Sequence, residues 1–375
     1  MRLLHLHSSF HAGGKELRAA QLINAFGKGV AHTIVSAQPD ALGAASAIDA
    51  RMTVSYPQDF PALAGRPTLG RLLRLARAMR GFDLVLTYNW GAMDAAMAHT
   101  LFGEFLSLPP LVHHEDGFNQ DEAQRLKPVR NWYRRIGLGR AAAVVVPSRR
   151  LEGIALDAWH LPRGKVRRIV NGIDTAAYAR KPRPDALPRV IKRPGEKWLG
   201  TLAGLRPVKN LPRLVRAFHA LPEDWQLVIL GEGPDRAAIQ AEAMRLDVAH
   251  RVHLPGFIAD PATAIGLFDL FALSSESEQF PISVVEAMAT GLAVAAPAVG
   301  DVAAMLAPEN AAYVTPPGDE GALADALLAL AEDAPLRAAI GAANRRRARA
   351  EYDEKAMIAA YRAVYGGALG RGAFP

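Results

Sequence analysis

The chain has 375 residues and no cysteine, so disulfide bonds cannot stabilise it. No apolar run approaches the ~20 residues of a membrane span, and residues 1–7 lack the apolar core of a signal peptide. The absence of cysteine is typical of the reducing cytoplasm. The sequence therefore predicts a cytoplasmic protein, a location that includes the inner face of the cytoplasmic membrane.

Two common nucleotide-binding motifs are also missing. Gly14-Lys15-Glu16 does not complete the Gly-x4-Gly-Lys-Ser/Thr loop of P-loop NTPases. An Asp-x-Asp pair, which can hold a metal-bound diphosphate, is absent as well. We therefore expect no cofactor and no required metal.

The most informative segment runs from Ser274 to Gly291 and contains two acids, Glu278 and Glu286. A short apolar strand, a polar loop and a helix beginning at Pro281 are expected here, and free amides at a helix N-terminus favour phosphate binding. Glu286 lies in an apolar helical run, where a buried carboxylate needs hydrogen-bond donors such as the two hydroxyls of a ribose. The alternative is a solvated Glu286 and an ordinary loop acid at position 278.

The same segment resembles the Glu-x7-Glu signature of retaining glycosyltransferases of family 4, which have the GT-B fold. The matching residues are Glu278, Phe280, Pro281, Glu286, Ala287, Met288, Ala289 and Gly291. One position departs from the pattern, because Gln279 stands where the family usually has glycine. A side chain at that point is expected to alter the sugar pocket.

A second resemblance lies at residues 204–211, which match the family's Gly-Arg…Lys-Gly/Asn element. It implies that Arg206 and Lys209 hold the donor diphosphate, and fixed cations can offset the charge of that leaving group without a metal. The alternative is a loop with two solvated cations. The signature loop adds Gln279, Phe280, Pro281 and Ile282 to the expected donor contacts, with Glu286 on the ribose and Glu278 on the sugar hydroxyls.

The first half of the chain carries softer signals. Gly13 and Gly14 follow the first expected strand, and the resemblance makes them candidate donor contacts. Family members often carry a histidine near the donor sugar. His114 matches this histidine, and His113 is the second candidate. A structural histidine pair remains open, and so does a metal site, although adjacent residues of a strand point to opposite faces.

The fold class expected from this resemblance is α/β: GT-B, with two Rossmann-like doubly wound domains and a deep cleft between them. Alternating strand-like and helical runs agree with parallel sheets. We expect an acceptor-binding domain at residues 1–180, a proline-rich linker at 181–196 and a nucleotide-sugar-binding domain at 197–350. Residues 351–375 should form a helix that packs back on the first domain.

The expected function is a retaining, metal-independent hexosyltransferase that moves a sugar from a UDP- or GDP-linked donor to a glycan or lipid-linked acceptor. His114 and Glu278 are its expected catalytic residues. An epimerase or a phosphorylase on the same fold is an alternative, and so is a non-catalytic sugar-nucleotide-binding subunit. The formal charge is +7, and nothing indicates nucleic acid.

Basic residues concentrate between Arg125 and Arg150, where Trp132 and Tyr133 lie among Arg130, Arg134 and Arg135. Cations interleaved with aromatics are typical of a helix on an anionic membrane surface, which would suit a lipid-linked acceptor. A solvated basic helix is the alternative.

Overall fold

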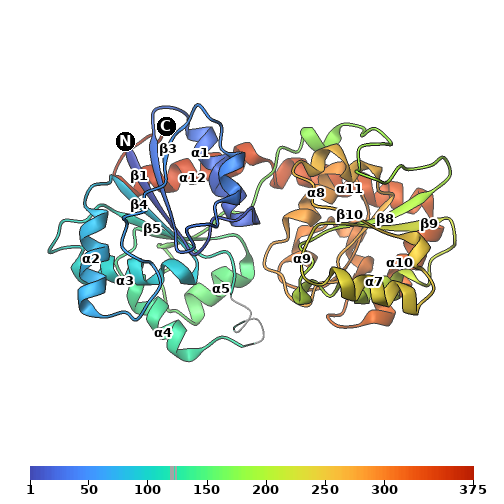
Figure 1. Ribbon diagram of the computed structural model, residues 1–375, viewed down its shortest axis with the longest axis horizontal. Helices are drawn as coiled ribbons and strands as arrows, with labels where there is room; N and C mark the ends of the chain where they lie inside the picture. The colour runs from blue at the N-terminus through green and yellow to red at the C-terminus, as the bar shows by residue number, and fades with distance from the viewer. Residues whose placement is uncertain (119–121, 123–124) are drawn as a thin grey trace. The chain divides into compact units, whose positions relative to one another are not determined.

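A computed structural model describes residues 1–118, 122 and 125–375. The chain divides into two compact units, the first formed by Met1–Val170 and Met357–Pro375 and the second by Asn171–Ala356. Both are α/β units built on parallel sheets (Figure 1).

The first unit has a seven-stranded sheet in the order β3-β2-β1-β4-β5-β6-β7, and every pairing is parallel. Its strands are β1 (Arg2–His7), β2 (Ala31–Ser36), β3 (Thr53–Ser55), β4 (Leu84–Tyr88), β5 (Leu111–His114), β6 (Ala143–Val146) and β7 (Val166–Arg168). Its helices are α1 (Gly14–Phe26), α2 (Leu69–Met79), α3 (Met93–Phe102), α4 (Pro128–Gly137) and α5 (Arg149–Asp157). Helix α12 (Glu354–Ala368) joins them from Met357 onward.

Helices cover both faces of this sheet. Successive residues of a strand alternate between faces, so Leu3 and Leu4 of β1 lie in different apolar clusters. One cluster includes residues of α2 and α3, and the other includes residues of α1 and α12. Burial of both faces explains why β4 and β5 are entirely buried along their lengths.

The second unit repeats the plan with six parallel strands in the order β10-β9-β8-β11-β12-β13. They are β8 (Lys197–Leu202), β9 (Trp225–Leu230), β10 (Val252–Gly256), β11 (Leu270–Ala272), β12 (Val294–Pro297) and β13 (Val314–Thr315). The helices are α6 (Leu211–Phe218), α7 (Arg236–Arg245), α8 (Ile282–Thr290), α9 (Val302–Met305), α10 (Glu320–Glu332) and α11 (Ala334–Glu351).

The last helix packs on the first unit. Arg362 Nη2 donates to the Ala25 carbonyl at 2.8 Å, and Tyr361 and Tyr365 are fully buried. Figure 1 shows α12, in red, beside α1 and β1. A helix at the end of the sequence therefore completes the core around the first strand.

The expected linker at residues 181–196 instead lies within the second unit. Its prolines prevent regular structure but not packing: Leu187 is buried, and Lys192 Nζ pairs with Asp269 at 2.6 Å and donates to the Leu267 carbonyl at 2.6 Å. The change of unit falls earlier, between Val170 and Asn171.

The order of strands locates the ligand edge of each sheet. In both, the chain runs outward in one direction from its first strand and then returns to continue on the other side, so a switch point lies between β1 and β4 and between β8 and β11. Open α/β sheets bind ligands outside the carboxyl ends of the strands at such a point. In the second unit, the loops at that edge are residues 203–210 and 273–281.

Candidate functional site

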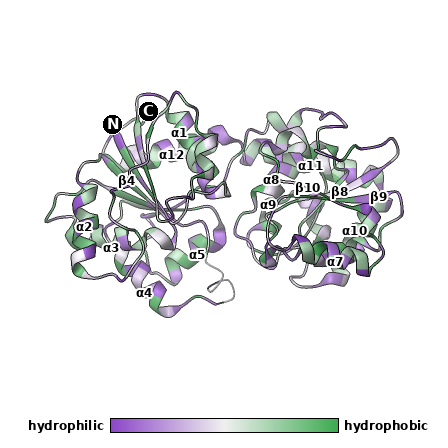
Figure 2. Cartoon of the chain, viewed as in Figure 1, coloured by the Kyte–Doolittle hydropathy of each residue, from purple (hydrophilic) through white to green (hydrophobic). Residues whose placement is uncertain are grey.

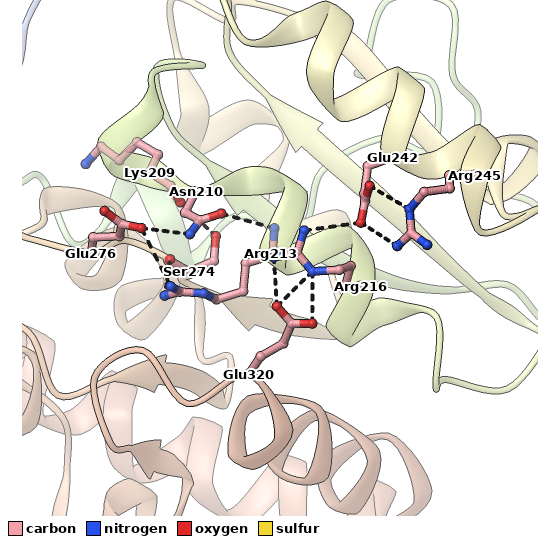
Figure 3. A network of polar contacts seen from close by, with 9 residues as sticks. All are labelled: Lys209, Asn210, Arg213, Arg216, Glu242, Arg245, Ser274, Glu276 and Glu320. Atoms are coloured by element: carbon pink, nitrogen blue, oxygen red, sulfur yellow. Dashed lines mark hydrogen bonds and ion pairs between the residues drawn. The ribbon is translucent and has the colours of Figure 1, made fainter.

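The two loops that follow β8 and β11 are joined to each other. The Glu276 amide donates to the Val208 carbonyl at 2.9 Å, and Ser274 Oγ donates to the Lys209 carbonyl at 2.9 Å. Figure 3 shows Ser274 and Glu276 beside Lys209 and Asn210 at the start of α6. The sequence elements around Lys209 and Glu278, 69 residues apart, thus form one surface at the switch point.

Asn210 makes the turn between the Lys209 loop and α6. Its φ of 43° is left-handed, a conformation that asparagine tolerates better than most residues. Its Oδ1 accepts from the Arg213 amide at 3.3 Å as a helix cap, and its Nδ2 donates to Glu276 Oε1 at 2.9 Å. These two side-chain bonds fix the turn directly after Lys209.

The charged groups of the site are Lys209, Glu278 and Arg206. Lys209 Nζ forms an ion pair with Glu278 Oε1, and Ser275 Oγ donates to the same oxygen at 2.7 Å. Arg206 is exposed. Two cations and an oriented carboxylate therefore surround the switch point. The contact of Ser275 was not predicted from the sequence.

The backbone of the Glu278 loop packs against Gly300 and Asp301. The Asp301 amide donates to the Gln279 carbonyl at 3.0 Å, and Gly300 has a left-handed φ of 57°. A Cβ on Gly300 would lie 2.7 Å from the Gln279 carbonyl oxygen and closer still to that of Glu278. Within the described chain, the buried Oε1 of Gln279 has no hydrogen-bond partner.

Helix α8 begins at Ile282, one residue later than expected, and Pro281 is its N-cap. No side chain caps the helix, and the Val284 amide donates to the Pro281 carbonyl at 3.1 Å. The amides of Ile282 and Ser283 have no acceptor within the helix and lie at the carboxyl edge of the sheet. Phe280 is buried and packs edge-on against Tyr352, with ring centroids 5.6 Å apart. Phe280 thus anchors the loop, while the helix N-terminus offers an anion site.

Glu286 is buried rather than solvated, with 8% of its surface exposed. Tyr178 donates a hydrogen bond of 2.7 Å to Glu286 Oε1. Burial raises the pKa of Glu286 to about 7, the Tyr178 bond opposes that rise, and the charge of Asp260 adds to it. Tyr178 was not identified from the sequence, because nothing marks a tyrosine 108 residues away as the partner of a carboxylate.

Gly13 and Gly14 belong to the first unit, at the carboxyl end of β1. Gly13 is the N-cap of α1 and Gly14 its first residue. A Cβ on Gly13 would lie 2.8 Å from Glu16 Oε2, and Glu16 is paired with Lys15. The glycine therefore leaves room for this ion pair at the helix start.

His114 is the expected site residue whose surroundings differ most from the expectation. It is 1% exposed; Nδ1 contacts the Thr87 carbonyl at 3.2 Å and Nε2 the Tyr365 hydroxyl at 2.9 Å. Burial lowers its pKa to about 3. His113 is also buried, with Nδ1 2.9 Å from Thr87 Oγ1. Both rings are directed into the core, because β5 is covered on both faces.

A charged pair at the same end of the first sheet was missed. Arg18 of α1 binds Asp116 through two hydrogen bonds, one of them 2.9 Å from Nη2 to Oδ2. The Asp116 amide donates to Asn89 Oδ1 at 2.7 Å, which connects the ends of β5 and β4. Burial acts to raise the pKa of Asp116, but Arg18 outweighs it and the pKa is lowered. Only the fold brings residues 18 and 116 together.

Neither a metal site nor a membrane span is found in the part of the chain that the structure describes. No group of three or more histidine, aspartate or glutamate residues there could hold a metal ion. No helix there is long and apolar enough to cross a bilayer.

Comparison with known proteins covers both units. Residues 12–177 match the model of Glycosyltransferase Family 4, and residues 184–347 match that of Glycosyl transferases group 1. The N-acetyl-alpha-D-glucosaminyl L-malate synthase of Bacillus anthracis is 25% identical over 54% of each chain. The GDP-mannose-dependent alpha-mannosyltransferase of Mycobacterium tuberculosis is 28% identical over 73% of this chain and 71% of its own. The chain thus spans about half of the first relative.

Two solved structures share the fold. Anabaena HepE, crystallised with UDP, superposes with a TM-score of 0.80 at 18% identity over 98% of this chain and 100% of its own. Sucrose-phosphate synthase from Thermosynechococcus elongatus gives a TM-score of 0.76 at 22% identity over 99% and 100% of the two chains.

Proposed function

Because the chain belongs to glycosyltransferase family 4 and has the GT-B fold of two Rossmann-like domains, we propose that it transfers a sugar from a nucleotide-sugar donor to an acceptor hydroxyl with retention of configuration. The donor is UDP- or GDP-linked, in keeping with the UDP of HepE and the GDP-mannose of the mycobacterial relative. The acceptor is a glycan or a lipid-linked glycan, and it binds mainly to the first domain.

The observation that supports this proposal best is the joining of Lys209, Glu278 and the open N-terminus of α8 at one switch point. A diphosphate placed there would meet the amides after Pro281 and the side chains of Lys209 and Arg206. These fixed positive charges would stabilise the departing nucleoside diphosphate without a metal. Glu286 would accept hydrogen bonds from the ribose, and Glu278 from the sugar.

The proposed reaction proceeds on one face of the sugar. The bond between the anomeric carbon and the diphosphate oxygen breaks first, and the leaving phosphate remains beside the cationic sugar. The acceptor hydroxyl attacks the same face, forms the new glycosidic bond and gives its proton to the leaving phosphate oxygen. Retention then needs no covalent enzyme intermediate. His114 is left out of this proposal because both of its ring nitrogens are engaged inside the first unit.

The proposal is tested by changing Lys209→Ala. Loss of the cation should weaken UDP or GDP binding and lower kcat/KM by about a hundredfold, the cost of removing one transition-state charge contact. Lys197→Ala is the matched control, since Lys197 lies at the opposite end of β8 and pairs with Asp224 at 2.7 Å.

Thermal shift with UDP, GDP and their sugars, with magnesium and with EDTA, reads out binding, and transfer assays read out kcat/KM. Normal turnover by the Lys209 variant would contradict the proposal. Conversion of the donor without an acceptor would indicate an epimerase. A requirement for free phosphate would indicate a phosphorylase, and nucleotide binding without turnover would indicate a non-catalytic subunit.

A further inference from the structure

Tyr178 is the one side chain that donates to the buried carboxylate of Glu286 in the described chain. The two residues are 2.7 Å apart from hydroxyl to Oε1, and each is 8% exposed. The rest of α8 around Glu286 is apolar, with Val285 and Ala287 fully buried. The orientation of this carboxylate therefore depends on one hydroxyl.

The segment that carries Tyr178 is held firmly. Tyr178 lies in a short 3-10 helix, η4 (Ala177–Ala179), whose first turn is fixed by Asp174 Oδ1 accepting from the amides of Ala176 and Ala177 at 3.0 and 3.1 Å. Thr175 Oγ1 donates to Asp353 Oδ2 at 2.7 Å, which ties the same segment to the end of α11. Such anchoring allows Tyr178 to orient another group rather than follow it.

The environment of Glu286 contains few other charges. The elements packed against α8 are η4, η7 (Pro261–Thr263), η8 (Ile265–Leu267), β12 and α11. Asp260, just before η7, raises the pKa of Glu286, whereas Arg345 of α11 contacts the Thr290 carbonyl at the far end of α8. The residues of η8 and β12 carry no titratable side chain. Tyr178 is thus the neighbour that favours the ionised carboxylate.

We propose that Tyr178 is a positioning residue for the nucleotide donor: its hydrogen bond to Oε1 fixes the Glu286 carboxylate so that Oε2 accepts hydrogen bonds from the ribose hydroxyls. This inference rests on the proposed function, because it needs a nucleotide at Glu286. A carboxylate has about four acceptor sites, so one bond from Tyr178 leaves enough for two vicinal hydroxyls. Ionisation matters because a protonated carboxyl loses acceptor capacity.

The test compares Tyr178→Phe with the native chain in binding of UDP and GDP between pH 5.5 and 9. Loss of the hydroxyl removes a bond that favours the charged form, so the pKa of Glu286 should rise. Binding at pH 7 should weaken about tenfold, as expected for one hydrogen bond to a charged group, and its rise with pH should move to more alkaline values. The 2′-deoxy forms of both nucleotides should lose much less on the same substitution.

Three controls make the result decisive. Glu286→Gln reports the titration of the nucleotide phosphates alone, and Tyr313→Phe removes another tyrosine hydroxyl from the same unit. The melting temperature without nucleotide shows whether Tyr178→Phe folds normally. An unchanged affinity and pH profile in a folded Tyr178→Phe would overturn the positioning role while leaving the glycosyltransferase proposal intact. Failure of the native chain to bind either nucleotide would instead overturn the proposed function.

Discussion

Gln279 stands where the Glu-x7-Glu signature is expected to have glycine, and the structure shows what its side chain introduces. Its carbonyl is fixed by the Asp301 amide at 3.0 Å, so the backbone has little freedom to move away. Its side-chain Oε1 is buried and, in the described chain, lacks a donor. An unpaired buried acceptor costs stability, on the order of 1–3 kcal/mol, unless a ligand satisfies it.

Replacing Gln279→Gly should therefore change which sugar is accepted rather than how the nucleotide is held. The substitution removes the side-chain carboxamide next to Glu278, while Lys209 and the start of α8 remain in place. We expect the ratio of kcat/KM for two sugars on the same nucleotide to change by about tenfold, with affinity for the free diphosphate unchanged within about threefold. Competition between paired donors measures the ratio. An equal loss for all donors would contradict a role in selectivity.

At this scale the sequence predicted what depends on neighbours along the chain and missed what depends on folding. Glu278 and Lys209 were predicted from local sequence motifs, and the structure brings them together. Tyr178 and Asp116 were missed because their partners lie 108 and 98 residues away. The surroundings of His114 were misjudged because strand position alone does not tell which sheet face a helix from the end of the chain will cover.

Helix α4 shows how one element can serve both the core and the surface. Two of the expected surface cations face inward: Arg134 is fully buried and contacts Glu115 at 3.2 Å, and Arg130 pairs with Glu122 at 2.9 Å. The opposite face exposes Trp132 and Val129, at 64% and 79%. Figure 2 shows hydrophilic and hydrophobic residues mixed along this helix. Helical periodicity predicts two faces of the helix, but it does not predict which arginine forms an ion pair with a buried glutamate.

The exposed face of α4 is the part that we propose contacts an anionic membrane. Changing Trp132 and Arg135 together to Gln should weaken binding to phosphatidylcholine vesicles containing phosphatidylglycerol by about tenfold, since each basic residue near such a surface contributes about 1 kcal/mol and Trp anchors at the interface. Arg346→Gln on α11, an exposed arginine 3.6 Å from Glu309, is the control. Vesicle flotation measures binding. The membrane proposal would be refuted if the native chain failed to bind anionic vesicles at low salt.

At the scale of the whole molecule, the element order was predictable because apolar runs alternating with helical ones admit few arrangements other than parallel sheets. The position of the proline-rich segment at residues 181–196 was not predictable, because composition indicates which segments lack regular structure but not which domain they pack against. The two units also differ in buried chemistry. The first holds the buried histidines His5, His7, His32 and His114, all with lowered pKa values, caused mainly by burial. The second holds Glu286, whose pKa is raised to about 7.

These shifts predict opposite responses of the two units to mild acid. A histidine whose pKa is lowered by folding binds a proton more readily in the unfolded chain than in the folded one. As the pH falls below 6.5, each such histidine therefore reduces the free energy of unfolding of the first unit by up to about 1.4 kcal/mol per pH unit. Glu286 binds a proton in the folded state first, so between pH 7 and 4.5 its contribution to the second unit rises as the pH falls. One histidine with a lowered pKa, the partly buried His253, opposes that gain.

Between pH 6.5 and 5 the first unit should therefore lose protection before the second. Hydrogen exchange, corrected for the intrinsic rate at each pH, measures this in peptides from β1 and β4 against peptides from β8 and β9. His7→Phe should reduce the acid sensitivity of the first unit, because neither His7 nitrogen has a partner in the described chain and phenylalanine leaves no unpaired group. His11→Gln, at an exposed position of the same unit, should leave it unchanged. Equal loss of protection in both units would show that the buried histidines do not control acid stability.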